Sequence, residues 1–166
     1  VRDDYEVVPA GEECDVDYLL LNTCGFIGDA KEESIQAILQ AVERKKEGKV
    51  GNIFVFGCLS QRYNAEMPGL IPEVDGWFGA RDIEPVVTAL GSRMHRERRC
   101  ERILTGKKLP YAYLKISEGC DRRCSYCAIP FIRGAHRSVP IEDLVEEARG
   151  LVSGGVKELV LIAQDT

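Results

Sequence analysis

Three cysteines, Cys120, Cys124 and Cys127, lie close together in the sequence and are the residues best suited to chemistry. Cysteine thiolates are the usual protein ligands of iron–sulfur clusters. At the spacing C-x-x-x-C-x-x-C they can hold three irons of a four-iron cluster, which leaves the fourth iron open to bind and activate a further ligand. A zinc ribbon would instead show paired C-x-x-C motifs. The spacing therefore predicts an open 4Fe–4S cluster; the alternative is three small buried apolar residues.

Two further cysteines, Cys24 and Cys58, each follow directly after a short apolar run, at 18–22 and 53–56. Such runs are typical of buried parallel strands. If the two strands are parallel neighbours, both thiols lie at the same edge of the sheet. Neighbouring strands are about 4.8 Å apart, so the two sulfurs can serve one metal centre. Two cysteines alone leave core packing as an equal alternative.

Alternating strands and helices must position these cysteines. The segment 29–47 predicts a helix that starts at Asp29, whose carboxylate caps it, and that buries one apolar face. The residues of this face are Ile35, Ile38, Leu39 and Val42. A strand at 76–78 and a helix at 82–90 complete the pattern. It indicates an α/β layer in which helices cross over between parallel strands.

The pattern restarts after a basic segment. A strand at 111–117 precedes the cysteine loop, a helix opens at Ser138, and a second strand spans 157–163. The buried face of that helix is predicted to consist of Ile141, Leu144, Val145, Ala148, Leu151 and Val152. A strand, a loop that carries the site, a helix and a parallel strand are typical of the first units of a (β/α) barrel.

We therefore predict an α/β protein in three parts. An N-terminal parallel-sheet domain spans 1–91, a basic linker spans 92–108, and the first βα units of a truncated (β/α) barrel span 109–166. Two strands cannot close a barrel, and the sequence opens without an initiator Met. We therefore expect a piece that lacks both ends of its parent protein and is inactive alone.

The composition is that of an ordinary globular protein, with 45% hydrophobic and 30% charged residues and a net charge of −5. No apolar run approaches the roughly 20 residues needed to cross a bilayer, and no hydrophobic leader opens the chain. We therefore expect a cytoplasmic protein with no membrane partner. The odd, clustered set of seven cysteines favours metal binding over a secreted disulfide scaffold. Of the remaining two, Cys14 lies among acidic residues and Cys100 in the basic segment, and neither is assigned a role.

The basic segment 92–108 has two interpretations. It is either a solvated linker between domains or a contact surface for RNA or the ribosome. An acidic chain with one short basic stretch is not typical of a dedicated nucleic-acid-binding protein.

In chain order, three motifs together resemble one family, the radical S-adenosylmethionine (SAM) methylthiotransferases. They are Asn22-Thr23-Cys24-Gly25-Phe26-Ile27, Gly57-Cys58-Leu59, and the cysteine loop with Tyr126 before its last cysteine. The segment 111–120 and the ending Ala163-Gln164-Asp165-Thr166 resemble the RimO type. That type modifies an aspartate in the decoding-centre protein of the small ribosomal subunit. The MiaB type, which modifies an adenosine of tRNA, more often shows Gln-Asn at positions 164 and 165.

The resemblance implies two 4Fe–4S clusters and SAM as cofactors. The loop cysteines match the cluster that binds SAM; Cys24 and Cys58 match two of the three ligands of an auxiliary cluster. Cys14 does not match the third ligand, so that position has no counterpart in this sequence. The implied reaction is reductive cleavage of SAM to a 5′-deoxyadenosyl radical. The radical takes hydrogen from the aspartate β-carbon, sulfur comes from the auxiliary cluster, and a second SAM supplies the methyl group.

The implied partners are the ribosomal protein substrate, an electron donor, and the ribosome or RNA as a further contact. By the same resemblance, Tyr126 lies near the adenine of SAM. Gln164 and Asp165 stand at the carboxyl end of a strand, where polar residues either contact ligands or cap the next loop. Arg133 and Arg137 either steady the cysteine loop, meet an anionic substrate, or form loop salt bridges.

Three alternatives remain at this point. The first is a tRNA adenosine methylthiotransferase, which shares the chemistry and differs in substrate. The second is a non-catalytic iron–sulfur protein, which the three-cysteine loop disfavours because electron carriers usually saturate every iron with protein ligands. The third is that the chain by itself does nothing, since an incomplete barrel exposes strand edges and apolar faces.

Overall fold

The computed structural model describes residues 4–8, 14–81, 83–92 and 109–165. The chain divides into two units, residues 1–94 and 95–166, which are described separately. All but one residue of the predicted linker 92–108 lies outside the described residues. Its bounds, its basic character as a contact surface and the surroundings of Cys100 therefore stay predictions.

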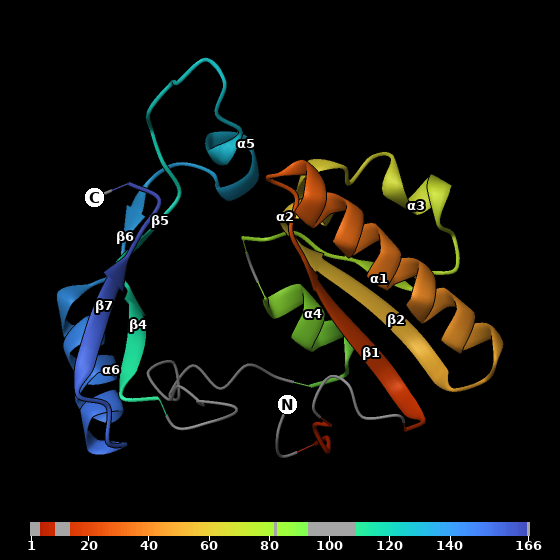
Figure 1. Cartoon of the computed structure of the whole chain (residues 1–166), viewed down its shortest axis with the longest axis horizontal. Helices are drawn as coiled ribbons and strands as arrows, with labels where there is room; N and C mark the ends of the chain where they lie inside the picture. The colour runs from red at the N-terminus through yellow and green to blue at the C-terminus, as the bar shows by residue number, and fades with distance from the viewer. Residues whose placement is uncertain (1–3, 9–13, 82, 93–108, 166) are drawn as a thin grey trace. The chain divides into compact units, whose positions relative to one another are not determined.

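A three-stranded sheet in the order β1-β2-β3 forms the centre of the first unit. Its strands are β1 (Val16–Thr23), β2 (Val50–Gly57) and β3 (Gly76–Trp77), and all are parallel. Helix α1 (Gly28–Lys46) connects β1 to β2 and lies along one face of them (Figure 1). The predicted parallel pair joined by a crossover helix is therefore present.

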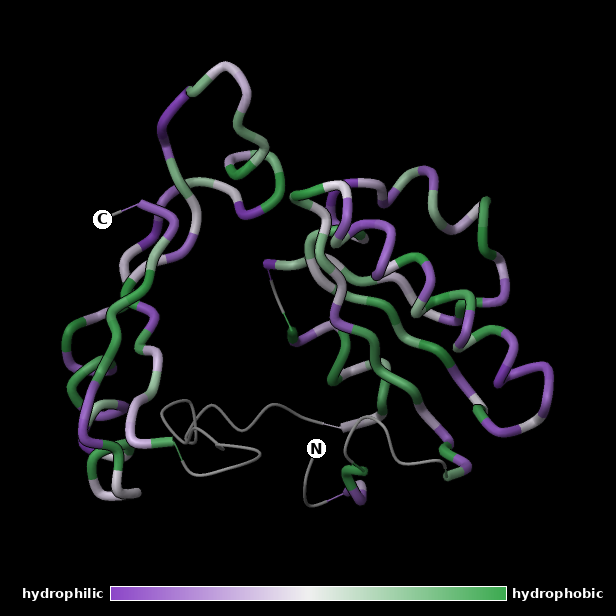
Figure 2. Tube along the Cα trace, in the orientation of Figure 1, coloured by the Kyte–Doolittle hydropathy of each residue, from purple (hydrophilic) through white to green (hydrophobic). Residues whose placement is uncertain are grey.

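The core of the first unit lies between α1 and the sheet. Ile38 of α1 and Ile53 of β2 are fully buried there, and Val55 and Leu59 pack with them. The strands are coloured largely hydrophobic in Figure 2, whereas the turn that follows α1 is hydrophilic. Burial of these aliphatic side chains is the main force that holds the helix on the sheet.

The buried face of α1 differs from the predicted one. It consists of Ser34, Ile38, Ala41 and Val42, whereas Ile35 and Leu39 are 36% and 43% exposed. The helix also begins one residue before Asp29, and its N-cap residue Ile27 makes no side-chain capping bond. The predicted Asp29 cap is therefore wrong; Asp29 lies in the first turn, where its charge still favours the helix N-terminus.

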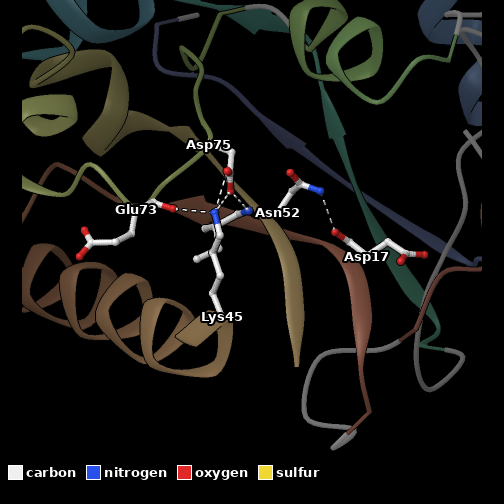
Figure 3. Close-up of polar contacts among 6 residues, drawn as sticks. Asp17, Lys45, Asn52, Glu73 and Asp75 are labelled. Atoms are coloured by element: carbon white, nitrogen blue, oxygen red, sulfur yellow. Dashed lines mark hydrogen bonds and ion pairs between the residues drawn. The ribbon is translucent and has the colours of Figure 1, made fainter. Parts of the chain in front are cut away.

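The end of α1 is tied to the sheet by a polar network (Figure 3). Lys45 Nζ donates to both carboxylate oxygens of Asp75, at 2.6 and 2.5 Å, and to the carbonyl of Glu73 at 3.0 Å. The Ile53 amide donates to the same Asp75 carboxylate at 2.7 Å. Asp75 therefore joins the helix to the middle strand, directly before β3.

Three short helices complete the first unit: α2 (Cys58–Arg62), α3 (Met67–Leu70) and α4 (Glu84–Ala89). Helix α2 starts at the residue after β2, so it leaves the carboxyl end of the middle strand. An aromatic row joins β1 and β2 to the segment after β3. Ring centroids of Tyr18 and Phe54 are 5.5 Å apart, and those of Phe54 and Phe78 are 5.4 Å apart.

The second unit contains a parallel pair, β4 (Tyr111–Lys115) and β7 (Glu158–Ile162), with helix α6 (Ile141–Ser153) between them in the chain. This is one βα unit and the next strand, as predicted. The predicted strand 111–117 is interrupted at Ile116, whose amide still bonds to the Ile162 carbonyl at 3.0 Å. Of the predicted buried face of α6, only Leu151 is fully buried.

An antiparallel pair that the sequence did not predict follows β4. It consists of β5 (Ser117–Glu118) and β6 (Arg137–Ser138). The cysteine loop and the short helix α5 (Ile129–Arg133) lie between these two strands in the chain. The two strands therefore bring the ends of that loop together. No helix in the described part of the chain is both long and apolar enough to span a membrane.

Candidate metal centres

The first candidate centre lies at the carboxyl edge of the sheet in the first unit. Thr23 and Gly57, the last residues of β1 and β2, are partners in the register of the two strands. Cys24 and Cys58 follow these residues directly, so both cysteines emerge at the same edge, as their sequence positions predict. Cys58 is buried and Cys24 is half-buried.

The turn at Cys24 is packed tightly against the start of α2. A Cβ atom on Gly25 would lie 2.8 Å from the carbonyl carbon and oxygen of Cys58 and from the Leu59 amide nitrogen. Only a glycine allows the two cysteine-bearing segments to approach this closely. The Gly25 carbonyl also accepts a hydrogen bond from Arg62 Nη1 at 3.0 Å. The backbone therefore fixes the two cysteines at one edge.

The hydroxyl groups of Ser34 and Thr23 form hydrogen bonds at the same edge of the sheet. The Cys24 amide donates to Ser34 Oγ at 3.0 Å, and that hydroxyl donates to the Ala30 carbonyl at 2.7 Å. Thr23 Oγ1 donates to the Phe56 carbonyl at 2.8 Å. Because Ser34 and Thr23 are both buried, these bonds satisfy polar groups that water does not reach.

The second candidate centre is the cysteine loop of the second unit. The loop begins after β5 at Gly119, which has a φ of +77° that suits glycine. Cys120 is buried, Cys127 is half-buried and Cys124 is exposed. The Arg122 amide approaches Cys120 Sγ at 3.4 Å, and the Cys127 amide bonds to the Cys124 carbonyl at 3.1 Å.

Gln164 and Asp165, at the carboxyl end of β7, both contact this loop. Gln164 Oε1 accepts a hydrogen bond from the Gly119 amide at 3.1 Å. Asp165 Oδ1 accepts one from Arg122 Nε at 2.8 Å, and its other oxygen lies 3.7 Å from Cys120 Sγ. The backbone carbonyl of Asp165 accepts from Ser117 Oγ at 2.7 Å. Here the two residues contact the start of the loop; their predicted contact with a cofactor stays a prediction.

The ion pair between Arg122 and Asp165 shifts the titration of both groups. The hydrogen bond from Arg122 is the largest cause that lowers the pKa of Asp165, and it outweighs the opposing effect of burial. The hydrogen bond to Asp165 likewise raises the pKa of Arg122. A carboxylate that stays ionised beside Cys120 leaves a fixed negative charge on the strand side of the loop, balanced by the arginine.

The other site residues named from the sequence are found around the loop. Tyr126 is 92% exposed. Arg133 Nη1 lies 3.6 Å from Glu118 Oε2, which makes Arg133 a salt-bridge partner of the strand before the loop. Arg137 is exposed and lies opposite Glu118 in the β5–β6 pair. The His136 amide donates to Asp121 Oδ1 at 2.9 Å.

Among the described residues, no group of three or more His, Cys, Asp or Glu side chains is arranged to hold a metal ion. The three loop thiols therefore do not converge here, and they would have to turn toward one another to share a cluster. The donor set nevertheless fits one: the thiols lie on one short loop, and an amide N–H already points at Cys120. Amide hydrogen bonds to sulfur are a normal feature of iron–sulfur sites.

Several residues that build these centres were not found from the sequence. Gly25, Ser34 and Arg62 shape the Cys24–Cys58 edge, and Glu118 pairs with Arg133 across the base of the loop. A signal was present for Arg62, which lies one helical turn after Cys58 and so returns to the same edge. The others depend on contacts between segments that are far apart in the chain.

Two known families match separate parts of the chain. Residues 1–79 match the Uncharacterized protein family UPF0004, and residues 114–166 match the Radical SAM superfamily. The second match contains the cysteine loop, and the first contains both Cys24 and Cys58.

Curated relatives are similar over nearly the whole chain. The ribosomal protein uS12 methylthiotransferase RimO of Porphyromonas gingivalis is 54% identical over 147 residues, which is 89% of this chain and 34% of that protein. The protein of the same name from Bacteroides fragilis is 52% identical over 97% of this chain and 37% of its own length. That from Parabacteroides distasonis is 46% identical over 99% and 38%. The chain spans about a third of the length of these relatives.

Proposed function

We propose that this chain, which belongs to the radical SAM methylthiotransferases of the RimO type, is part of an enzyme that adds a methylthio group to the β-carbon of an aspartate in ribosomal protein uS12. The observation that carries the proposal is the three-cysteine loop after a strand, in a chain 46–54% identical to relatives named for that activity. Every relative named above carries the RimO name, so the tRNA alternative is not favoured.

The cofactors are SAM and two 4Fe–4S clusters. Cys120, Cys124 and Cys127 hold the cluster that binds SAM, while Cys24 and Cys58 hold an auxiliary cluster whose third ligand is not assigned in this chain. Such clusters, when bound, supply reductive cleavage of SAM and a source of sulfur. Support for the auxiliary site comes from the shared sheet edge and from Gly25, which lets the two cysteine segments meet.

Other residues in and beside the loop are proposed to position the loop and to bind SAM. Gln164 and Asp165 hold the start of the loop through Gly119 and Arg122. In the loaded enzyme they would also contact SAM, since polar residues at the carboxyl end of a barrel strand often contact ligands. Tyr126, which is almost fully exposed, is available to cover the adenine. The ion pair between Arg122 and Asp165 keeps the carboxylate from competing with the thiolates for metal.

The architecture and partners follow from the same assignment. The parallel unit β4–α6–β7 supports a radical-SAM (β/α) barrel of which this chain supplies the first units. The exposed apolar residues Ile141, Val145 and Val152 of α6 agree with such a unit, because they are available to pack on further elements. The expected partners are uS12 as substrate, an electron donor and the ribosome, in the cytoplasm.

The deciding experiment is anaerobic reconstitution of the enzyme that contains this chain, beside a variant with Cys120, Cys124 and Cys127 replaced by alanine. We expect about eight irons in the first and about four in the second, with SAM cleavage lost. About four irons in the parent enzyme and none in the variant would show that the auxiliary cluster does not exist. Full iron without SAM cleavage would favour the non-catalytic iron–sulfur protein.

A substrate test then separates the two enzymatic alternatives. The reconstituted enzyme is given either a uS12 segment that contains the aspartate or unmodified tRNA. Mass spectrometry should find the added methylthio group on the uS12 segment only. Modification of the tRNA instead would overturn the RimO-type assignment.

A further inference from the structure

The ends of the cysteine loop are brought together by contacts that involve no cysteine side chain. Glu118 pairs with Arg137 in the β5–β6 ladder, and the Cys120 amide bonds to the Gly134 carbonyl at 3.1 Å. A Cβ on Gly119 would collide with the carbonyl of Ala135. Backbone on both sides of the loop is therefore in direct contact at its base.

One ion pair crosses this base between side chains. Arg133, the last residue of α5, places Nη1 3.6 Å from Oε2 of Glu118, the last residue of β5. Their side chains are only 25% and 22% exposed. A half-buried pair is screened less by solvent and salt than a surface pair.

The other partner of Glu118 lies on the same side of the loop. Lys115, at the end of β4, forms an ion pair with the same Glu118 oxygen. Lys115 and Glu118 both precede the loop, whereas Arg133 follows it. Loss of Lys115 therefore removes a charge from Glu118 without releasing either end of the loop, which makes it a matched control.

We propose that Glu118 and Arg133 are positioning residues that clamp the base of the cysteine loop and so set how readily its thiols bind metal. The inference rests on the proposed metal-binding role of the loop. A closed base restricts the conformations open to the three thiols before metal arrives, and less entropy is then lost when they converge. Opening of the base should weaken metal binding without removing any ligand.

The clamp itself can be tested without metal. In the full chain, chymotrypsin has its target side chain already exposed at Tyr126. Cleavage also needs the backbone on both sides of Tyr126 in extended form, so its rate rises with the open population of the loop. Arg133→Met should raise that rate about fivefold, the factor that corresponds to loss of about 1 kcal/mol. Lys115→Met should change it less than about twofold.

A double-mutant cycle guards against a variant that simply unfolds locally. Glu118→Gln alone should have an effect at least as large as that of Arg133→Met, because it also removes the pair with Lys115. The two substitutions together should add little to Glu118→Gln alone, because both remove the Glu118–Arg133 pair. Additive effects, or a Lys115→Met effect as large as that of Arg133→Met, would overturn the clamp.

The metal-binding step uses Co²⁺ alone as the probe. All four cysteines outside the loop (Cys14, Cys24, Cys58 and Cys100) are replaced by serine, so that only the loop thiols report. Sulfur-to-cobalt absorption should show a weaker Kd for Arg133→Met than for Lys115→Met, by the factor by which the closed fraction falls and by at most about fivefold. An equal Kd in both would overturn the positioning role. No Co²⁺ absorption even without either substitution would instead contradict the proposed function, while the cleavage rates would still decide whether the clamp exists.

Discussion

The two candidate centres rest on different kinds of support. Cys24 and Cys58 follow two long parallel strands that are paired at seven positions. Beside Cys24, the backbone of Gly25 packs on the backbone of Cys58. Cys120, Cys124 and Cys127 lie on a loop whose base is closed by a two-residue antiparallel ladder and one ion pair. The first centre is part of a sheet edge, whereas the second lies on a loop that joins two short strands of its own unit.

This difference has a consequence for stability. Cys24 and Cys58 can move apart only if the first unit unfolds, because their position depends on the core between α1 and β2. The loop-borne set depends on a few polar contacts, each worth about 1 kcal/mol or less. Such a loop can rearrange around a ligand at small cost, whereas the sheet edge cannot.

The largest effect is expected from the core of the sheet. Ile53 is fully buried between α1 and β2, so Ile53→Ala should destabilise the first unit by about 2–5 kcal/mol. Urea unfolding followed by tryptophan fluorescence measures this, since Trp77 packs against the same core. Chymotrypsin cleavage after Tyr126 in the second unit should stay unchanged, and a parallel rise in that rate would show that the two supports are not independent.

A more local change tests the contact between the two cysteine segments. Gly25→Ala places a Cβ 2.8 Å from the Cys58 backbone, which must move, and we expect a loss of about 1–3 kcal/mol. Gly28→Ala is the matched control, because no atom lies within 4 Å of its added Cβ and the residue begins α1. It should be neutral or slightly stabilising when thermal unfolding of both variants is compared with that of the original chain. Equal effects of the two would argue against close packing at this edge.

The Lys45–Asp75 network should contribute a smaller, pH-dependent stability to the same unit. Burial alone would raise the pKa of Asp75, but the hydrogen bonds from Lys45 and the Ile53 amide outweigh it and hold the pKa below the ordinary value of 3.8. A carboxyl with a lowered folded-state pKa stabilises the fold above its unfolded pKa, and that contribution is lost as the pH falls through the folded value. Asp75→Asn should therefore cost about 1 kcal/mol at pH 7 and progressively less below about pH 4.

Denaturation at pH 7 and pH 3 measures the difference between Asp75→Asn and the original chain. A constant difference at both values would mean that the packing of the side chain, and not its charge, supplies the stability. Glu43→Gln is a suitable control, since its pair with Lys46 is exposed on the surface of α1.

The placement of Cys24 and Cys58 at one sheet edge could be predicted from the sequence, whereas the closure of the cysteine loop could not, and the reason is physical. Apolar runs before Cys24 and Cys58 and the crossover helix determine parallel register, and register places both residues at one edge. The face of α1 was harder to predict: Ile35 and Leu39 fit the helical period, but Ser34 faces the sheet because its hydroxyl bonds to the Cys24 backbone. Hydrophobic period alone does not reveal such a bond.

The closure of the loop could not be predicted, because strands of two residues carry no periodic signal. Arg133 was recognised as a residue that could steady the loop or form a salt bridge, yet its partner Glu118 was not, since the pair joins positions on opposite sides of the loop. The spacing of the three cysteines was informative for the opposite reason: it is local in the sequence. Local spacing predicts which ligands are available, and non-local contacts decide how they are held.

The smallest effect is expected from the contact between Arg122 in the loop and Asp165 after β7. It tests whether the loop is held at its base or by this contact. Asp165→Asn removes the charge that pairs with Arg122, whose side chain is 68% exposed, and solvent already screens that pair. Chymotrypsin cleavage after Tyr126 should therefore rise less than about twofold, well below the effect of Arg133→Met. If Asp165→Asn opened the loop as much as Arg133→Met does, the loop would be held from β7 and not at its base. Contacts with the neighbouring strand would then be its principal support, as they are for the sheet-borne centre.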